Sequence, residues 1–267
     1  MHPLHDPVAA MMREVAETIM MPRHRRLAAD EVMQKGPDDP VTIVDRESEA
    51  LFTARLPVLL PGSRVVGEEA CAADERLIET LGDGVVWIVD PLDGTSNFAA
   101  GEGAFGIMVA LAEGGVVQAG WVYDPVRKRM CHAALGGGAF VDGARVGTPA
   151  SGGEPPVAAL ATKYLPEAKR PLVAAAVAGK LAEVPVPGCA AEQYPRVALG
   201  ENDIALFWRT LPWDHAPGAL FLEEAGGRVA YLDGGAYRVT ERRAGMIAAA
   251  SPALWDYAAA LIAPALR

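Results

Sequence analysis

Cysteine is scarce in this sequence, which has only three among its 267 residues. Cys71, Cys131 and Cys189 are far apart and form no Cys-x-x-Cys pair. A small secreted domain held together by disulfides would carry more cysteines at closer spacing. The cysteine content therefore argues against a disulfide framework and favours a reducing compartment.

Long apolar runs are also missing. No apolar run reaches the roughly 18 residues that are needed to cross a bilayer. The apolar positions near the N-terminus are interrupted by Arg13, Glu14 and Glu17, which is unlike the core of a secretory signal. We therefore expect a cytoplasmic protein with no membrane partner.

Positive charge is in the minority. The chain has 24 Lys and Arg against 34 Asp and Glu, which gives a formal net charge of −10. Such a balance disfavours binding to nucleic acid or to an acidic membrane surface. We interpret the short basic run from Arg23 to Arg26 as solvated charges at the end of a helix. We expect no nucleic-acid partner.

Apolar residues are abundant, at 51% of the chain, and their spacing predicts the elements. A helix is expected over the first ~20 residues, and another from Val41, after a Gly- and Pro-rich loop at 36–40. Residues 104–146 are typical of an antiparallel meander, because Gly114-Gly115, Asp124-Pro125 and Asp142-Gly143 are turn pairs.

The second half alternates between strand-like and helix-like segments. Strands are predicted at 156–165, 182–188, 202–210, 228–232 and 245–251, and helices at 167–181, 190–201, 213–227 and 252–266. Alternation after a meander indicates a layered α/β architecture. The best candidate boundary is the Gly-, Ser- and Pro-rich stretch at 151–156, which separates an α+β part (1–150) from an α/β part (151–267).

The stretch VVWIVDPLDGTSNF places two carboxylates at the end of a buried strand. Pro91 and Gly94 predict a turn that brings Asp90 and Asp93 to the same side, and the residues from Gly94 on resemble the start of a helix. Backbone N–H groups at a helix start bind phosphate, and hard cations such as Mg²⁺ bind carboxylates and carbonyls. A plain turn remains the alternative, whereas an EF-hand is excluded because its carboxylates alternate.

Other acidic residues follow predicted strands or begin predicted helices. Glu68 and Glu69 end the strand at 63–67, Asp214 begins a helix, and Asp45 lies near the start of another. Each alone is typical of a helix cap or a surface charge. Their convergence on Asp90 and Asp93 would instead form a metal site.

Several segments, in order, resemble the inositol monophosphatase family of metal-dependent sugar and polyol phosphatases. They are VTIVDRESE, VVGEEA, WIVDPLDGTSNF, GVVQAGWVYDPV and PWDHAPGALFLEEAGG. The resemblance runs from about residue 8 to the C-terminus. It implies an αβαβα five-layer sandwich of the inositol monophosphatase and fructose-1,6-bisphosphatase type, one compact catalytic unit, and a homodimer.

The resemblance also implies ligands for two to three Mg²⁺ ions. Glu68, Asp90 and the Leu92 carbonyl would hold the first ion. Asp90, Asp93 and Asp214 would hold the second, where Li⁺ would inhibit, and a weaker third ion would lie against Glu68.

Further roles follow from the same resemblance. Thr95, paired with Asp45, would orient and deprotonate a water molecule. The backbone N–H groups of Gly94 and Thr95 would hold the phosphate. Lys35 would lie on a mobile loop that closes over the site.

At the substrate end, the resemblance implies that Asp93 and the backbone at Ala190 bind hydroxyl groups. An acidic residue is also common in the family seven positions before Asp214, but this chain has Phe207 there. A carboxylate accepts hydrogen bonds from two adjacent hydroxyls, whereas phenylalanine only packs. This difference puts an inositol phosphate in doubt and favours a ring-bearing substrate.

The roles of four neighbouring residues stay open. Trp208 and Arg209 either shape the pocket or pack at the edge of a strand. Arg196 is expected to face solvent. His215 is expected to point away from the ion beside Asp214, because adjacent helical side chains diverge by ~100°.

The sequence therefore predicts a Mg²⁺-dependent phosphomonoesterase that acts on a small polyol or sugar phosphate. Alternatives with the same chemistry are histidinol phosphate, fructose 1,6-bisphosphate, adenosine 3′,5′-bisphosphate and NADP. An alternative of another class is a non-catalytic binding protein on the same fold.

Overall fold

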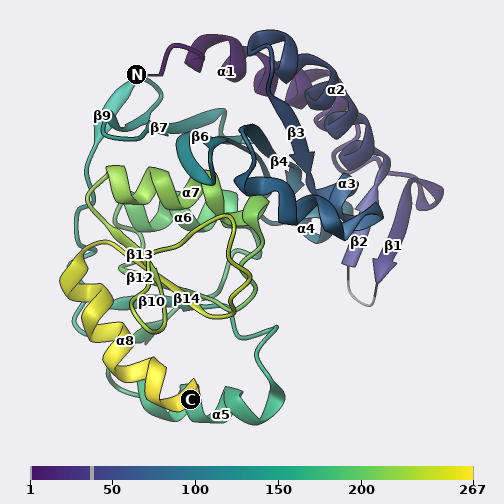
Figure 1. The fold of residues 1–267 in the computed structure, drawn as a ribbon. Coiled ribbons are helices and arrows are strands. Elements are labelled where there is room, and N and C mark those ends of the chain that lie inside the picture. The colour runs from purple at the N-terminus through teal and green to yellow at the C-terminus, as the bar shows by residue number, and fades with distance from the viewer. Residues whose placement is uncertain (1, 37–38, 267) are drawn as a thin grey trace.

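The computed structural model describes residues 2–36 and 39–266, which form two large β-sheets between layers of helices (Figure 1). The larger sheet has seven strands in the order β3-β4-β5-β6-β7-β8-β9. Neighbouring strands are antiparallel, except that β3 and β4 are parallel. The bounds are Arg64–Gly67 (β3), Val85–Asp93 (β4), Gly106–Glu113 (β5), Val116–Asp124 (β6), Arg129–Ala134 (β7), Gly138–Val141 (β8) and Ala144–Val146 (β9).

The smaller sheet has five strands in the order β11-β10-β12-β14-β13. Strand β10 is parallel to β11 and β12, whereas β14 is antiparallel to β12 and β13. The bounds are Val157–Leu160 (β10), Ala182–Glu183 (β11), Ile204–Phe207 (β12), Arg228–Tyr231 (β13) and Met246–Ala249 (β14). Strands β1 (Val32–Gly36) and β2 (Asp39–Thr42) pair as a separate antiparallel hairpin.

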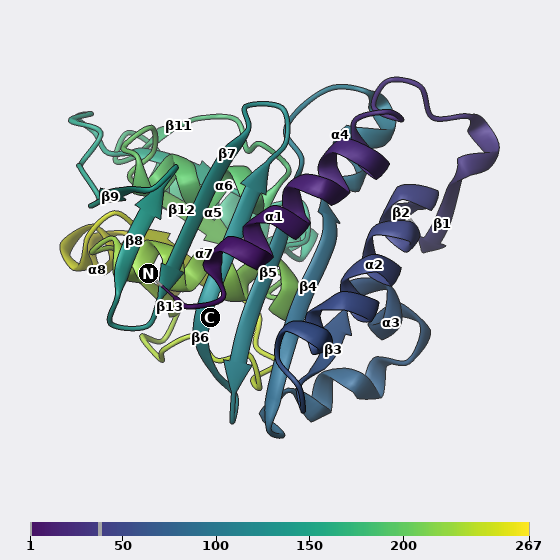
Figure 2. The ribbon, with the colours of Figure 1, turned by 90° about the horizontal axis from the view of Figure 1, so that it is seen from above.

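Helices form three layers around these sheets. Figure 2 shows α1 (His5–Val15) and α2 (Ile43–Leu59) lying across the outer face of the larger sheet. Helices α6 (Ala190–Ala198) and α7 (Pro212–Glu224) lie between the sheets, and α5 (Arg170–Val177) and α8 (Pro252–Leu266) cover the smaller sheet. This order confirms the predicted αβαβα five-layer sandwich.

Shorter helical segments connect these layers. Helix α1 continues as a π-helical turn, and α3 and α4 follow strands β3 and β4 of the larger sheet. The bounds of these segments are Ala16–Met20 (π), Glu68–Ala73 (α3), Thr95–Ala100 (α4), and the 3₁₀ turns Ala29–Glu31, Glu75–Gly82 and Glu167–Lys169. In the described part of the chain, no helix is both long and apolar enough to cross a membrane.

Helix α7 is the centre of the core, because it contacts strands of both sheets and α6. Most of its side chains are buried. Glycine allows this close packing, since a Cβ atom on Gly218 would lie 2.1 Å from the ring of Tyr194 in α6. The packing holds the first turn of α7, which carries Asp214, against the end of β4.

Several of the predicted elements differ from the structure. The strand predicted at 182–188 is only Ala182–Glu183. Residues 36–40 were expected to form a loop, but Gly36 and Asp39 belong to the paired strands β1 and β2. Helix α2 therefore begins at Ile43 instead of Val41. Pro37 and Asp38 lie outside the described residues. The strands predicted at 156–165 and 202–210 end at Leu160 and Phe207. Beyond these residues, the apolar side chains line a cavity instead of continuing the sheet.

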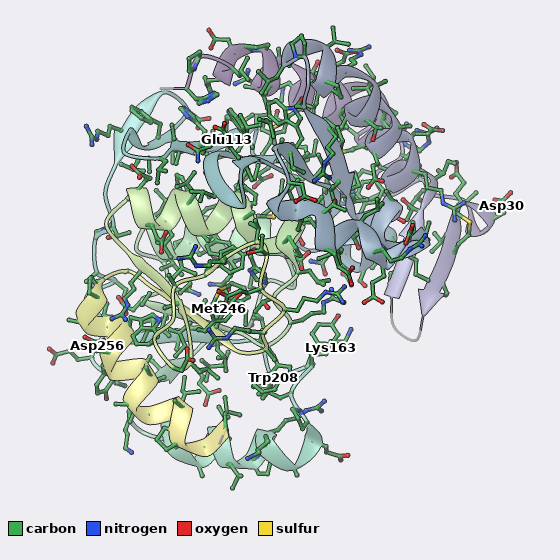
Figure 3. All side chains as sticks on the ribbon, viewed as in Figure 1. Asp30, Glu113, Lys163, Trp208, Met246 and Asp256 are labelled. Carbon is green, nitrogen blue, oxygen red and sulfur yellow. The ribbon has the colours of Figure 1, made fainter. Side chains whose placement is uncertain are left out.

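The boundary expected at 150/151 falls in the segment that joins β9 to β10. There the chain passes from the larger sheet to the smaller one. Figure 3 shows Lys163 and Trp208, which come from the loops after β10 and β12, on the same side of the smaller sheet.

Candidate active site

Four carboxylates from three elements line one small cavity of about 100 Å³. Asp90 and Asp93 lie at the end of β4, and Asp214 lies in the first turn of α7. Glu68 begins α3 directly after β3, which is the parallel neighbour of β4. The structure therefore brings together the acidic residues that the sequence placed at separate element ends.

Burial and the charges of neighbouring carboxylates raise the pKa values of Asp90, Asp93 and Asp214. Burial, followed by the charges of Glu68, Asp93 and Asp214, holds the pKa of Asp90 well above its ordinary value. The pKa of Asp214 is raised by burial and by Asp93 and Glu68. Burial raises the pKa of Asp93 to about 6, although the Ala191 N–H donates a hydrogen bond to its Oδ2 atom. A cation in this cavity would relieve the repulsion.

The donor atoms fit a hard divalent cation. Carboxylates and the backbone of Leu92 line the cavity, and carboxylate and carbonyl oxygens are the ligands that Mg²⁺ prefers. Within residues 2–36 and 39–266, however, no three Asp, Glu, His or Cys side chains are close enough to form a ready ligand cluster. Four like charges repel one another, so a closer arrangement requires the cation itself.

Lys35 supplies part of the missing positive charge. Its Nζ atom lies 2.7 Å from Glu68 Oε1 and 2.8 Å from Glu69 Oε1. Burial lowers the pKa of Lys35, but the two carboxylates outweigh burial and the net shift is upward. The residue lies on strand β1, whereas the resemblance placed it on a loop. The hairpin of β1 and β2 is thus attached to Glu68 and Glu69 by the ion pairs of Lys35.

Asp45 and Thr95 are paired behind the small cavity. The Thr95 hydroxyl lies 3.0 Å from Asp45 Oδ1 and 2.9 Å from the Leu92 carbonyl. The other Asp45 oxygen accepts hydrogen bonds from the N–H and hydroxyl of Thr42, which caps α2. Burial raises the pKa of Asp45 to about 7, against the effect of the Thr42 hydrogen bonds. Asp45 is thus a carboxyl group that gains and loses a proton near neutral pH.

Gly94 links the strand to helix α4. Its φ angle is +85°, and a Cβ atom there would lie 2.7 Å from the carbonyl oxygen of Ala104. Only glycine adopts this conformation without strain. The turn places the first N–H groups of α4, at Thr95 and Ser96, beside the cavity, where no intrahelical partner exists for them.

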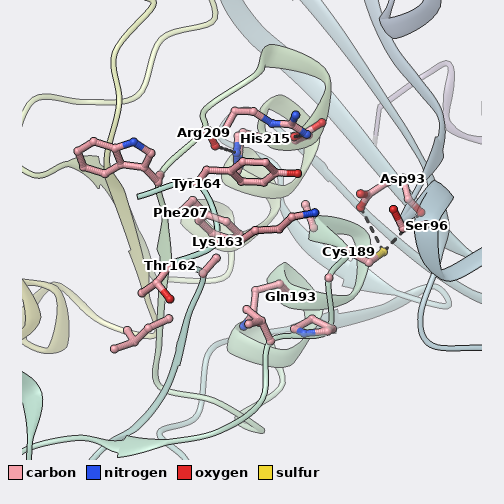
Figure 4. A pocket seen from close by; sticks show the side chains of 18 of the residues that line it. Asp93, Ser96, Thr162, Lys163, Tyr164, Cys189, Gln193, Phe207, Arg209 and His215 are labelled. Atoms are coloured by element: carbon pink, nitrogen blue, oxygen red, sulfur yellow. Dashed lines mark hydrogen bonds and ion pairs between the residues drawn. The ribbon is translucent and has the colours of Figure 1, made fainter. Parts of the chain in front are cut away.

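A second, larger cavity of about 560 Å³ adjoins the first (Figure 4). Asp93 and Ala190, both expected at the substrate, line it. Phe207, Trp208 and Arg209 line it as well, so these residues do shape a pocket. About half of the lining residues are apolar or aromatic, and the others are polar or charged.

Phe207 and His215 form one packed group. The Phe207 ring stacks on Tyr194 and meets the His215 ring edge-on. The nitrogens of His215 are held by the Tyr194 hydroxyl at 2.9 Å and the Arg209 carbonyl at 3.0 Å. Burial lowers the pKa of His215 to about 4. His215 therefore lies at the cavity wall as a neutral ring whose nitrogens are both engaged.

Arg196 differs from its expected place in solvent. Its Nε atom lies 2.9 Å from Glu192 Oε1, and the Arg196 side chain is 26% exposed. Glu192 is nearly fully buried and also pairs with Arg129. Burial of a carboxylate requires such partners, which explains why Arg196 turns inward.

Sequence reasoning missed two groups at the site. The Glu49 carboxylate accepts hydrogen bonds from the N–H groups of Glu69 and Ala70, both at 2.8 Å, and so orients the start of α3. Its position four residues after Asp45 on the same helix was a usable signal. Gln193 lines the larger cavity at 2% exposure, and its amide has no hydrogen-bond partner in the part of the chain that is described. No pattern in the sequence indicated Gln193.

Comparison with known proteins agrees with this geometry. The model of the inositol monophosphatase family matches residues 2–267. The chain belongs to the inositol monophosphatase family. Its members are phosphoric monoester hydrolases, and the chain is therefore an enzyme of this class.

Individual relatives of this family member cover most of its length. The inositol-1-monophosphatase of Bacillus subtilis is 31% identical over 226 residues, which is 84% of this chain and 83% of that protein. The Nus factor SuhB of Escherichia coli K12 is 32% identical over 241 residues, 88% of this chain and 87% of that protein. The solved structure of a Thermotoga maritima IMPase has a TM-score of 0.82 at 24% identity and covers 99% of this chain and 98% of its own, which supports the fold.

Proposed function

We propose that this protein is a Mg²⁺-dependent phosphomonoesterase of a small phosphate ester. The observation that carries the proposal is the meeting of Glu68, Asp90, Asp93 and Asp214 in a cavity that adjoins a larger one. The smaller cavity suits the phosphate and its cations, and the larger cavity suits the alcohol. The oxygens that would hold two to three ions belong to Glu68, Asp90, Leu92, Asp93 and Asp214.

When bound, Mg²⁺ would supply positive charge toward the phosphate oxygens and make a bound water molecule more acidic. The chain's own groups do the rest. The Thr95 hydroxyl, held by Asp45, orients the attacking water, takes a proton from it and passes its own proton to Asp45 Oδ1. The bond from phosphorus to the ester oxygen then breaks, and the departing alcohol oxygen takes up a proton from solvent. The N–H groups of Gly94 and Thr95 hold the phosphate. Phosphoryl transfer depends mainly on such positioning and charge neutralisation, so no protein nucleophile is needed.

The alcohol would lie in the larger cavity, between Asp93 and Ala190 on one side and Phe207 on the other. Because Phe207 and its aromatic neighbours offer packing instead of hydrogen bonds, a plain polyol fits this cavity less well than a substrate with a ring or a further charged group. A cytoplasmic location and a homodimer remain predictions from the sequence.

A panel of phosphate esters tests the proposal. The panel contains inositol 1-phosphate, histidinol phosphate, fructose 1,6-bisphosphate, adenosine 3′,5′-bisphosphate and NADP. We expect release of inorganic phosphate from at least one ester with Mg²⁺, and loss of release with EDTA or with Li⁺. No release from any ester, or release that EDTA leaves unchanged, would contradict the proposal.

A second role has some support from the name of the Escherichia coli relative, which is a Nus factor. A protein that acts through its surface would keep its cellular function when chemistry is removed. The variant Asp93→Asn separates the two roles. Loss of both phosphate release and the cellular phenotype favours the enzyme, whereas a retained phenotype favours a binding role.

A further inference from the structure

The loop at 161–165, between β10 and α5, carries two side chains over the larger cavity. The Lys163 ammonium lies 5.3 Å from the centre of the Tyr164 ring, and the Arg209 guanidinium carbon lies 4.6 Å from it. Figure 4 shows the polar ends of Lys163 and Tyr164 directed into the cavity. Two cations thus flank one aromatic ring at the wall that faces Asp93.

Among the residues that the structure describes, Lys163 has no carboxylate within ion-pair distance of its ammonium group. Other cations of this chain are closely paired, such as Arg228, whose Nη1 lies 2.8 Å from Asp256 Oδ1. The Arg209 guanidinium lies 3.9 Å from the Asp214 carboxylate. Lys163 and Arg209 thus bring two positive charges to a cavity that Asp93 and Asp214 also line.

The position of these cations indicates what they bind. Tyr164 and Arg209 line both cavities, whereas Lys163 lines only the larger one. The phosphate that reacts would lie in the smaller cavity, beside Gly94. An anion at Lys163 would therefore belong to the alcohol part of the substrate.

We propose that Lys163 and Arg209, spaced by the Tyr164 ring, bind a second anionic group of the substrate. The substrate class is a phosphate ester whose alcohol carries another phosphate or a carboxylate. This inference rests on the proposed function, because it assumes that the ester phosphate occupies the smaller cavity. Phe207 agrees with it, since a carboxylate in its place would repel such a substrate.

Two esters that differ only in the second anion test the inference. Fructose 1,6-bisphosphate and fructose 1-phosphate are compared through kcat/KM with Mg²⁺, and through calorimetric binding in EDTA. The proteins are the wild type, Lys163→Met, Lys163→Arg and the control Lys180→Met, which removes an exposed lysine outside both cavities.

We expect the wild type to have a higher kcat/KM for the bisphosphate than for fructose 1-phosphate. Lys163→Met should lower the ratio of these two values about tenfold, mainly by raising the KM of the bisphosphate, because a charge-assisted contact is lost. Lys163→Arg should retain most of the preference, and Lys180→Met all of it. Added salt should weaken the preference, because the contact is ionic and partly exposed.

Two results would overturn the inference. One is a wild type with no preference for the bisphosphate, and the other is a Lys163→Met variant that loses both esters by the same factor. The latter would mean that Lys163 holds the reacting phosphate or the fold. If the wild type releases no phosphate from either ester, the proposed function fails, and the ratio of the two binding constants still decides whether Lys163 binds the second anion.

Discussion

The two walls of the candidate site are built in different ways. The acidic wall (Glu68, Asp90, Asp93 and Asp214) lies at the ends of packed strands and helices. Asp90 is buried, and the side chains of Glu68 and Asp214 are only 15% and 17% exposed. The loop wall (Lys163, Tyr164, Phe207, Trp208 and Arg209) consists of the last residue of β12 and of residues in the loops after β10 and β12. Its Tyr164 is 45% exposed. Residues on rigid elements hold the geometry that the chemistry needs, whereas loops vary with the substrate. The comparison suggests that the acidic wall determines the reaction and the loop wall determines the substrate.

The largest effect is expected from Asp90→Asn in the acidic wall. Loss of one shared ligand should lower kcat/KM by about 10³-fold or more for every ester, because metal-ion catalysis contributes several kcal/mol. Without Mg²⁺ the same variant should be more stable, by about 1–2 kcal/mol, because one of four repelling buried charges is gone. Phosphate release and urea unfolding measure the two effects. The exposed Asp30→Asn is the control, and an active Asp90→Asn would contradict the role of the acidic wall.

The second effect is stabilisation of the acidic wall by Mg²⁺. A ligand that binds only the folded state stabilises it by about 2.7 kcal/mol at 100 times its dissociation constant. We expect the melting temperature of the wild type to rise with Mg²⁺ concentration, and that of Asp90→Asn to rise much less. Phe207→Leu, which changes only the loop wall, should respond like the wild type. Equal shifts in all three proteins would indicate nonspecific binding of the ion.

The third effect is the pH dependence of stability. Acidification raises the contribution of one group behind the acidic wall to the free energy of unfolding and lowers the contribution of one group behind the loop wall. Asp45, behind the acidic wall, has a folded pKa of about 7, which burial raises above that of the unfolded chain. The folded state therefore binds this proton more readily, and acidification from pH 8 to 4 stabilises it. His215, behind the loop wall, has a folded pKa of about 4, so its contribution to stability is lost as the pH falls from about 6.5 to 4.

Urea unfolding without Mg²⁺, at several pH values from 8 to 4, separates these two contributions. Asp45→Asn should make the protein lose stability more steeply on acidification, and His215→Gln should make the loss less steep, each by on the order of 2 kcal/mol. Variants with the same pH profile as the wild type would show that neither pKa shift exists in the folded protein.

The smallest effect is expected from Phe207→Leu in the loop wall. Loss of the stacked contact with Tyr194 should lower the free energy of unfolding by about 1 kcal/mol. The kcat/KM of each ester should change by less than about threefold, because the ring shapes the cavity without making a polar contact. The matched control is Phe140→Leu, since that ring stacks on His132 and lies outside both cavities. A tenfold loss of activity would give Phe207 a direct role at the substrate.

The acidic wall could be predicted from the sequence because its residues lie in short, ordered motifs. Asp90, Asp93 and Gly94 are fixed relative to one another by a strand end, a proline and a turn, which are local features. The resemblance then supplied Glu68 and Asp214, and the structure places both on the same cavity. Lys35 was predicted to lie near the site, but the strand that carries it was not predicted. The Gly- and Pro-rich sequence at 36–40 is typical of a loop and does not indicate that β1 and β2 pair.

Only part of the loop wall could be predicted: Phe207, Trp208 and Arg209 were candidates for the pocket, whereas Lys163 and Tyr164 were not. Lys163 and Tyr164 were assigned to a strand, and nothing near them in the sequence points to Arg209, 45 positions away. Their contact depends on β10 and β12 being parallel neighbours, so that both chains leave the sheet at the same edge. Gln193 faces the cavity because of how α6 packs between the sheets, which is also a long-range effect.

The sequence by itself indicated the family through its ordered motifs and the layered fold through the alternation of its apolar segments. It also predicted the carboxylates of the candidate site, because Asp90 and Asp93 are held together by a local turn and the motifs supply Glu68 and Asp214. Only the tertiary structure decided that Lys35 pairs with Glu68 and Glu69, that Arg196 turns inward, and that two cations flank Tyr164 at the larger cavity. The physical reason is that charges distant in the sequence choose partners by burial and distance, and both are set by the packing of the two sheets around α7.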